Sequence, residues 1–237
     1  MLYPYAEFLI DFDRKHAAMV HQNCPENTRA AVLVETRPHF FAPMVIRNVM
    51  YFLGPRWNLH IMCSESAYSY LHKALRGWDV GITTIPGMGM RMPRTDYRAM
   101  KKSREFWMRF RESKLLIFEV DSLLSAANVE DFIGYDFVGA PCGRFDDHYV
   151  ANGGLSLRTR EVMIDCLSYF PPEPDIPEDV FFTNAVRSLG GSMPGLETAT
   201  RFSVESIYTT HPVGVHGTDK YYHSAEVAGK ITRAISY

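Results

Sequence analysis

The 237-residue sequence has few cysteines, no long apolar run and little excess of charge. No stretch approaches the roughly 18 consecutive apolar residues of a membrane span, so a transmembrane helix is not expected. A net charge of −2 argues against a general nucleic-acid-binding protein. The absence of any C-x-x-C pair excludes a zinc ribbon and favours reduced thiols over a disulfide framework. The four cysteines are Cys24, Cys63, Cys142 and Cys166.

Several catalytic motifs are also missing. Residues 87–92 begin like a dinucleotide fingerprint but have Met92 in place of the third glycine, so an NAD site is not expected. Residues 154–158 resemble a nucleophile elbow but end in Arg158 instead of glycine, which argues against a serine hydrolase. There is no Walker A loop and no H-E-x-x-H zinc motif.

Export signals are equally absent. Glu7, Asp11 and Asp13 interrupt the apolar stretch near the N-terminus, where a signal peptide would be apolar. No N-x-[ST] glycosylation acceptor occurs. These features predict a cytoplasmic protein; the alternative is the trimmed, soluble part of a Golgi or otherwise membrane-associated enzyme.

The residues that are present alternate between short apolar runs and segments with helical periodicity. This alternation predicts a single α/β domain with a mixed, largely parallel central sheet flanked by helices. The expected strands span residues 30–36, 58–63, 78–85, 114–124, 137–140, 154–157 and 203–208. The expected helices span residues 8–19, 43–52, 65–75, 95–110, 159–170 and 179–189.

The most informative run is LLIFEVDSLL at residues 115–124. Four apolar residues precede Glu119 and Asp121, whose spacing in a strand would point both carboxylates the same way. Two adjacent buried carboxylates need a compensating cation, and a hard divalent ion that prefers oxygen ligands fits. The alternative interpretation is a strand end with two solvated acids.

Three later segments add candidate ligands. ANGGLSLR (residues 151–158) places two glycines before a strand, either for close ligand approach or for a plain turn. PEDVFF (177–182) opens a helix with two acids, of which Asp179 could be a simple cap. GVHGTDK (214–220) places His216 and Lys220 in a glycine-flanked loop, suited to a metal and a phosphate respectively, although an isolated histidine is more often structural.

Taken in this order, the four motifs resemble the GT-A fold of nucleotide-sugar glycosyltransferases. More narrowly, the chain resembles a glycosyltransferase-like family catalogued as a domain of unknown function, with VETRPH (34–39), VIRNVMYFLGPRWNLH (45–60) and TDY (95–97) in agreement. The resemblance covers residues 29–223. We therefore expect an N-terminal helical extension at 1–28, a catalytic domain at 29–223 and a C-terminal tail at 224–237.

The resemblance implies a role for each matching residue. A D-x-D-like pair would hold Mn²⁺ or Mg²⁺, with Asp121 as the safer metal ligand and His216 completing the metal site. Glu119 departs from the family's Asp, so it is either a further metal ligand or a residue that touches the ribose of the nucleotide or a metal-bound water. The helix-opening acids resemble those of inverting enzymes such as fringe and the β-galactosyltransferases, which makes Asp179 the candidate base and Glu178 the second choice. The remaining expected nucleotide- or donor-binding residues are Glu35, Thr36, Arg37, Arg94, Tyr97, Asn152, Gly153, Gly154 and Lys220.

The sequence thus favours a metal-dependent, inverting glycosyltransferase that takes a nucleoside-diphosphate sugar as donor and an unidentified hydroxyl acceptor. A metal-dependent phosphoryl hydrolase and a non-catalytic nucleotide-sugar-binding module are the alternatives. Residues 91–114 hold nine basic against three acidic residues, which could steer an anionic ligand or simply form a solvated helix face.

Overall fold

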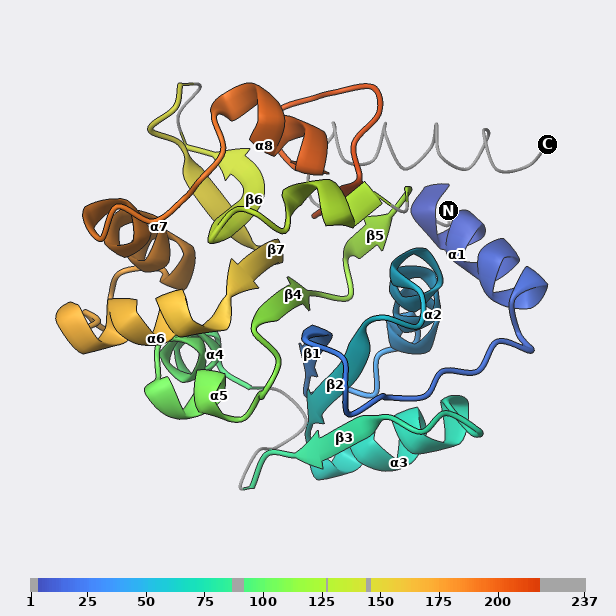
Figure 1. Cartoon of the computed structure of the whole chain (residues 1–237). Coiled ribbons are helices and arrows are strands. Elements are labelled where there is room, and N and C mark those ends of the chain that lie inside the picture. Colours follow the sequence, from blue (N-terminus) through green and yellow to red (C-terminus); the bar gives the residue numbers. More distant parts are fainter. Residues whose placement is uncertain (1–3, 87–91, 127, 144–145, 218–237) are drawn as a thin grey trace.

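The structure, a computed structural model, describes residues 4–86, 92–126, 128–143 and 146–217 (Figure 1). Its main sheet has six strands in the order β3-β2-β1-β4-β7-β6. Strands β1 to β4 run parallel, and within this sheet β7 pairs antiparallel with both β4 and β6. The strands are β1 Arg29–Glu35, β2 Asn58–Cys63, β3 Gly81–Thr84, β4 Lys114–Phe118, β6 Phe137–Cys142 and β7 Val150–Thr159. The predicted α/β domain with a mixed, largely parallel sheet is confirmed.

The helices around this sheet form two groups. In Figure 1, α1, α2 and α3 gather beside β1, β2 and β3, whereas α4 to α7 gather at the other end of the sheet. The helices are α1 Pro4–Lys15, α2 Ala42–Leu53, α3 Glu65–Ala74, α4 Arg94–Lys101, α5 Arg104–Met108, α6 Arg160–Tyr169, α7 Glu178–Ser188 and α8 Leu196–Phe202, with a 3₁₀ turn η1 at Asn128–Phe132. Among the described residues, no helix combines the length and apolarity that a membrane span requires.

A second, smaller sheet stands beside the end of β4. It contains β5 Ser122–Leu124, β9 Gly214–His216 and β8 Ser203–Val204, in the order β5-β9-β8. The register sets Ser122 opposite His216 in the antiparallel β5–β9 pair and Val204 opposite Val215 in the parallel β8–β9 pair. This sheet therefore brings the late histidine motif to the end of β4.

The structure corrects several predicted boundaries. The strand expected over 114–124 is two strands in different sheets, because the chain turns at Glu119, whose carbonyl accepts a hydrogen bond from Ser122 N at 3.0 Å. The helix expected over 95–110 is α4 and α5, with Ser103 Oγ capping α5 through Phe106 N at 3.2 Å. The first helix begins and ends four residues earlier than expected. Sequence patterns gave no signal for η1, α8 or β9.

The N-terminal extension packs on the rest of the fold. Tyr5, Phe8, Leu9 and Phe12 of α1 are buried in the main hydrophobic core. The Phe12 ring meets Tyr51 of α2 edge-on at 5.3 Å. The expected domain boundaries stay predictions, and the tail at 224–237 lies outside the described residues.

Candidate functional site

Three side chains converge where β4 ends. His216 Nε2 lies 3.4 Å from Asp121 Oδ1 and 3.6 Å from Glu119 Oε2. One donor atom from each of the three residues lies within 4.8 Å of the others. The expectation that Glu119 and Asp121 share one continuous strand is wrong, because both lie in the turn between β4 and β5, yet that turn aims both at His216.

The electrostatics of this triad are those of one cation among acids. Burial alone would lower the pKa of His216, but hydrogen bonding to Asp121, Glu119 and Glu205 raises it well above its usual value. Burial likewise opposes ionisation of Glu119, but the hydrogen bond with His216 and the charge of Lys101 lower its pKa to about 2. Glu119 is therefore ionised at neutral pH, as a carboxylate that binds a metal must be.

The NGG segment of β7 shapes the space around His216. Between the β6–β7 pairs Gly139–Ser156 and Pro141–Ala151 the register shifts, so that residues 152–155 bulge opposite a single residue of β6. A Cβ on Gly154 would overlap His216 Nε2. Gly154 is thus required by the position of the histidine ring, which was not the reason expected from the sequence.

Asn152 and Glu205 support the same ring. Asn152 Oδ1 accepts a hydrogen bond from Gly154 N at 2.7 Å, and Asn152 Nδ2 donates to Glu205 Oε1 at 3.2 Å. Glu205 Oε1 lies 3.3 Å from His216 Nδ1. Sequence reasoning missed Glu205, because a glutamate after a two-residue strand carries no motif of its own.

A buried ion-pair network joins the triad to the start of α7. Arg158 Nη1 donates to Glu178 Oε1, and Lys101 Nζ lies 3.1 Å from Glu178 Oε2 and 3.9 Å from Glu119 Oε1. Tyr97 donates to Glu119 Oε1 at 2.9 Å. Burial would raise the pKa of Glu178, but Arg158 and Lys101 lower it. Glu178 is 4% exposed, and its two carboxylate oxygens are ion-paired with Arg158 and Lys101.

The neighbouring acid, Asp179, is in a different environment. It stands at the second position of α7, and Pro177 is the residue before the helix, so Asp179 is not the cap that the sequence suggested as an alternative. Its Oδ1 accepts a hydrogen bond from Val180 N at 2.9 Å. Burial raises the pKa of Asp179, and the charge of Glu178 raises it further. Gly153 lies against both acids, since a Cβ there would be 2.6 Å from Glu178 Oε2.

The end of β1 contributes a third group of predicted residues. Glu35 binds Arg37 through both carboxylate oxygens, at 2.8 Å from Nε and 2.7 Å from Nη2. Hydrogen bonding to Glu35 raises the pKa of Arg37, and the charges of Asp121 and Glu119 raise it further. The guanidinium of Arg37 therefore lies close enough to the triad to interact electrostatically with Asp121 and Glu119. Thr36 accepts a hydrogen bond from Met92 N at 3.0 Å.

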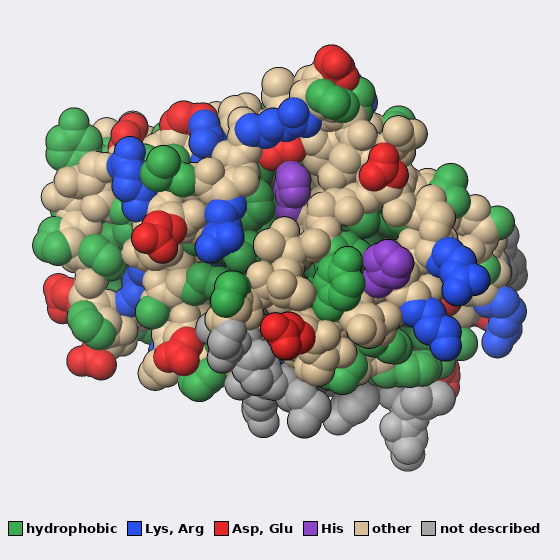
Figure 2. Space-filling model, turned by 90° about the horizontal axis from the view of Figure 1, so that it is seen from below, with side chains coloured by type: hydrophobic (Ala, Val, Ile, Leu, Met, Phe, Trp, Pro, Cys, Tyr) green, Lys and Arg blue, Asp and Glu red, His purple; other side chains and the backbone are tan. Residues whose placement is uncertain are grey.

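Two predicted residues remain. Arg94 is exposed at the start of α4 and is not among the side chains that converge at the triad, and Lys220 lies outside the described residues. The basic segment at 91–114 is not one surface, because Lys101 and Lys102 are buried and Lys102 donates to the carbonyls of Glu173 and Ile176. Figure 2 shows basic, acidic and apolar side chains intermixed on the face it presents.

The triad fits a hard divalent cation. It offers two carboxylates and one imidazole, and a second carboxylate–histidine contact lies behind the ring, an arrangement common at metal sites. Glu119 and Asp121 directly follow the carboxyl end of β4, a strand parallel to β1, where open α/β sheets bind their ligands, and β9 brings His216 to the same place. Glu119 replaces the expected aspartate and lies within the cluster, so it is a candidate ligand together with Asp121 and His216.

Comparison with known proteins gives a family and a fold. The sequence profile described as "Protein of unknown function (DUF5672)" matches residues 89–216. No curated protein matches the chain. The glycosyltransferase GlyE of Streptococcus pneumoniae TIGR4, in its apo form, is structurally similar with a TM-score of 0.53 and 12% identity over 86% of this chain. This chain spans only 60% of GlyE, so the likeness concerns the shared fold.

Two weaker structural similarities have TM-scores below 0.5. The mannosyltransferase PcManGT of Pyrobaculum calidifontis, solved with GDP-Man and Mn²⁺, gives 0.47 at 14% identity, covering 80% of this chain and 61% of PcManGT. HddC of Yersinia pseudotuberculosis gives 0.43 at 12% identity, covering 64% of this chain and 84% of HddC.

Proposed function

The chain belongs to the DUF5672 family of proteins of unknown function, and we propose that it is a metal-dependent glycosyltransferase that uses a nucleoside-diphosphate sugar and inverts the anomeric carbon. The observation that carries this proposal is the convergence of Glu119, Asp121 and His216 at the carboxyl end of β4. The fold shared with GlyE, a glycosyltransferase, supports the class of reaction but not the donor or the acceptor.

The chemistry required of the site is a single displacement. A bond forms between the acceptor oxygen and the anomeric carbon, while the bond from that carbon to the diphosphate oxygen breaks. When bound, a divalent ion would offset the negative charge of the leaving nucleoside diphosphate. Glu119, Asp121 and His216 would hold this ion, and Arg37, fixed by Glu35 beside the triad, would bind the anionic donor.

We assign the general base to Asp179 and not to Glu178. Glu178 is ion-paired with both Arg158 and Lys101, which hold it ionised and leave it little capacity to accept a proton. Asp179 is half-buried, and its raised pKa makes it the stronger base of the two. It would take the proton of the acceptor hydroxyl as the new glycosidic bond forms.

The test is turnover by an Asp179→Asn variant. Wild type is first screened against nucleotide sugars with Mn²⁺, by release of nucleoside diphosphate, to find its donor. With that donor, Asp179→Asn should lower kcat by about 10²–10⁴-fold, because a positioned base contributes that much, while donor affinity stays unchanged.

Glu197→Gln is the matched control, because Glu197 stands at the second position of α8 and is exposed. It should leave kcat unchanged. NMR of the product should show the inverted anomer. Near-normal turnover by Asp179→Asn would remove the base assignment, and a retained configuration would remove the inverting mechanism.

A further inference from the structure

We infer that Glu205 is a positioning residue that holds His216 in the orientation needed to bind a metal ion through Nε2. This inference rests on the proposed metal-dependent function. Glu205 follows β8 directly and is 4% exposed, so it is built into the interior beside the triad.

The small sheet explains why Glu205 meets His216. In the parallel β8–β9 pair Val204 faces Val215, which places the next residues of the two strands, Glu205 and His216, side by side. On the other edge of β9, His216 lies opposite Ser122, the residue after Asp121. The histidine is thus held between Glu205 on its Nδ1 side and Asp121 with Glu119 on its Nε2 side.

The contact between Glu205 and His216 Nδ1 determines which ring nitrogen of His216 can bind a metal ion. A metal ion binds a histidine ring that has lost one of its two N–H protons, and the partner that holds the remaining N–H decides which nitrogen offers its lone pair to the metal. Glu205 Oε1, 3.3 Å from Nδ1, is an acceptor and therefore favours the proton on Nδ1. The Nε2 lone pair then faces Asp121 and Glu119, the two other candidate ligands.

Glu205 is itself positioned by the NGG segment. Asn152 Nδ2 donates to the same Oε1 atom at 3.2 Å, and Asn152 Oδ1 accepts from Gly154 N at 2.7 Å. One motif therefore supplies both the amide that holds Glu205 and the glycine that leaves room for the ring. This gives Asn152 and Gly154 a role in supporting the metal site, distinct from the sugar contact expected from the sequence.

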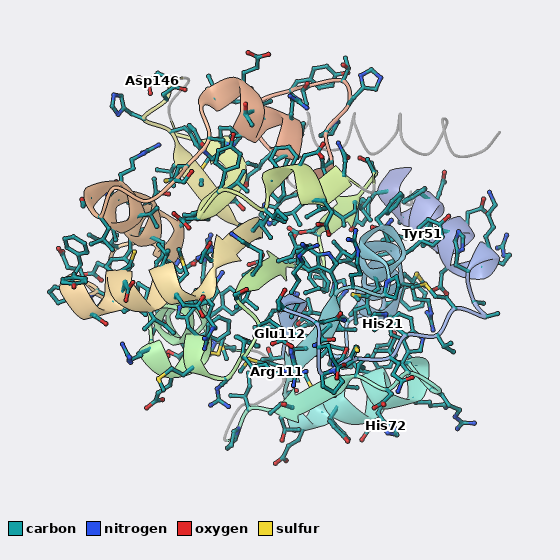
Figure 3. All side chains as sticks on the ribbon, in the orientation of Figure 1. His21, Tyr51, His72, Arg111, Glu112 and Asp146 are labelled. Atoms are coloured by element: carbon teal, nitrogen blue, oxygen red, sulfur yellow. The ribbon has the colours of Figure 1, made fainter. Side chains whose placement is uncertain are left out.

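The experiment is calorimetric titration of Mn²⁺ into wild type, Glu205→Gln, His216→Ala and the double variant. Carboxylates behind a metal-binding histidine typically contribute about 10–100-fold in metal affinity, so Glu205→Gln should weaken binding by that amount. In the His216→Ala background the same substitution should change affinity little, because its partner is gone. The matched control is Glu112→Gln, another buried glutamate, which lies beside Arg111 just before β4 begins (Figure 3) and should bind Mn²⁺ as wild type does.

The outcomes separate this inference from the proposed function. If wild type binds Mn²⁺ and Glu205→Gln binds it equally tightly, the inference alone is overturned. An equal loss of Mn²⁺ affinity from Glu205→Gln in the His216→Ala background also overturns it, since Glu205 would then act through its charge and not through His216. Absence of Mn²⁺ binding by wild type overturns both. If Glu205→Gln does not fold, Asn152→Ala replaces it, with a smaller loss of affinity expected that also disappears in the His216→Ala background.

Discussion

Two adjacent glycines of β7 face different parts of the site. Gly153 lies against Glu178 and Arg158, and Gly154 lies against His216. A side chain at Gly153 would meet the Glu178–Arg158 ion pair, and one at Gly154 would meet the candidate metal ligand His216. Glycine at these two positions therefore allows His216 of the triad and the Glu178–Arg158 ion pair to pack closely against β7.

Gly154→Ala should displace His216, because the new methyl group would overlap Nε2. We expect Mn²⁺ affinity to fall by at least about tenfold, as it does when a group that orients a metal ligand is lost. We also expect the free energy of unfolding to fall by about 1–3 kcal/mol, because the added methyl group overpacks the interior. Calorimetric titration and denaturant unfolding measure the two effects. Gly134→Ala is the control, since a Cβ there meets nothing within 4 Å. Unchanged metal affinity in Gly154→Ala would show that the histidine ring is not held there.

Single residues with strong chemistry were the most predictable from the sequence. Glu119 and Asp121 stand out because a hydrophobic strand rarely ends in two close carboxylates, and His216 because glycines flank it. Glu205 and Lys101 were not predictable in these roles. Their contacts with the site are made to residues that are distant in sequence, and an isolated glutamate or a lysine in a basic run is usually exposed.

At the scale of elements, the segment 114–124 shows that hydrophobic periodicity predicts where a strand forms but not which sheet the strand joins. Its apolar residues predicted β4 correctly, but nothing in the pattern marks where the chain leaves the main sheet. The second half, β5, joins a sheet whose other strands are two and three residues long. A strand was expected over 203–208, of which only the two residues of β8 form. The three residues of β9 have too little periodicity to be detected, so the element that brings His216 to the site could not be predicted.

The opposite end of β4 contains a polar cluster that contributes stability. Glu112 Oε1 accepts a hydrogen bond from Asn58 Nδ2 at 2.6 Å and lies 3.0 Å from His60 Nε2. Burial would raise the pKa of Glu112, but the hydrogen bonds from His60 and Asn58 lower it to about 2, against 4.5 for the unperturbed group. This difference corresponds to about 3 kcal/mol of stability.

Because the pKa of Glu112 is lower in the folded than in the unfolded protein, its contribution is complete above about pH 4.5 and disappears as the pH falls towards 2. Glu112→Gln should therefore lower the free energy of unfolding by up to about 3 kcal/mol at pH 7 and by much less near pH 2. Urea unfolding of both proteins across this range measures the difference. A difference that does not change with pH would contradict the hydrogen bonding of an ionised Glu112 by Asn58 and His60.

For the whole molecule, alternating strands and helices were enough to predict the α/β architecture and its mostly parallel sheet. A mixed sheet was expected, but which strand is reversed was not. That strand is β7, and its reversal carries the NGG segment past the end of β4. The overall arrangement follows from local hydrophobic patterning, whereas the site depends on long-range pairing among β4, β7 and the small sheet.

The central claim is that this fold binds a nucleoside diphosphate through a divalent ion held by the triad. Calorimetric titration of UDP and GDP, each with Mn²⁺ and each with chelator, into wild type and Asp121→Asn tests it most directly. We predict that one nucleotide binds wild type only when Mn²⁺ is present and that Asp121→Asn loses this binding while keeping its fold by circular dichroism. Equally tight nucleotide binding by wild type in chelator, or undiminished binding by Asp121→Asn, would contradict the account.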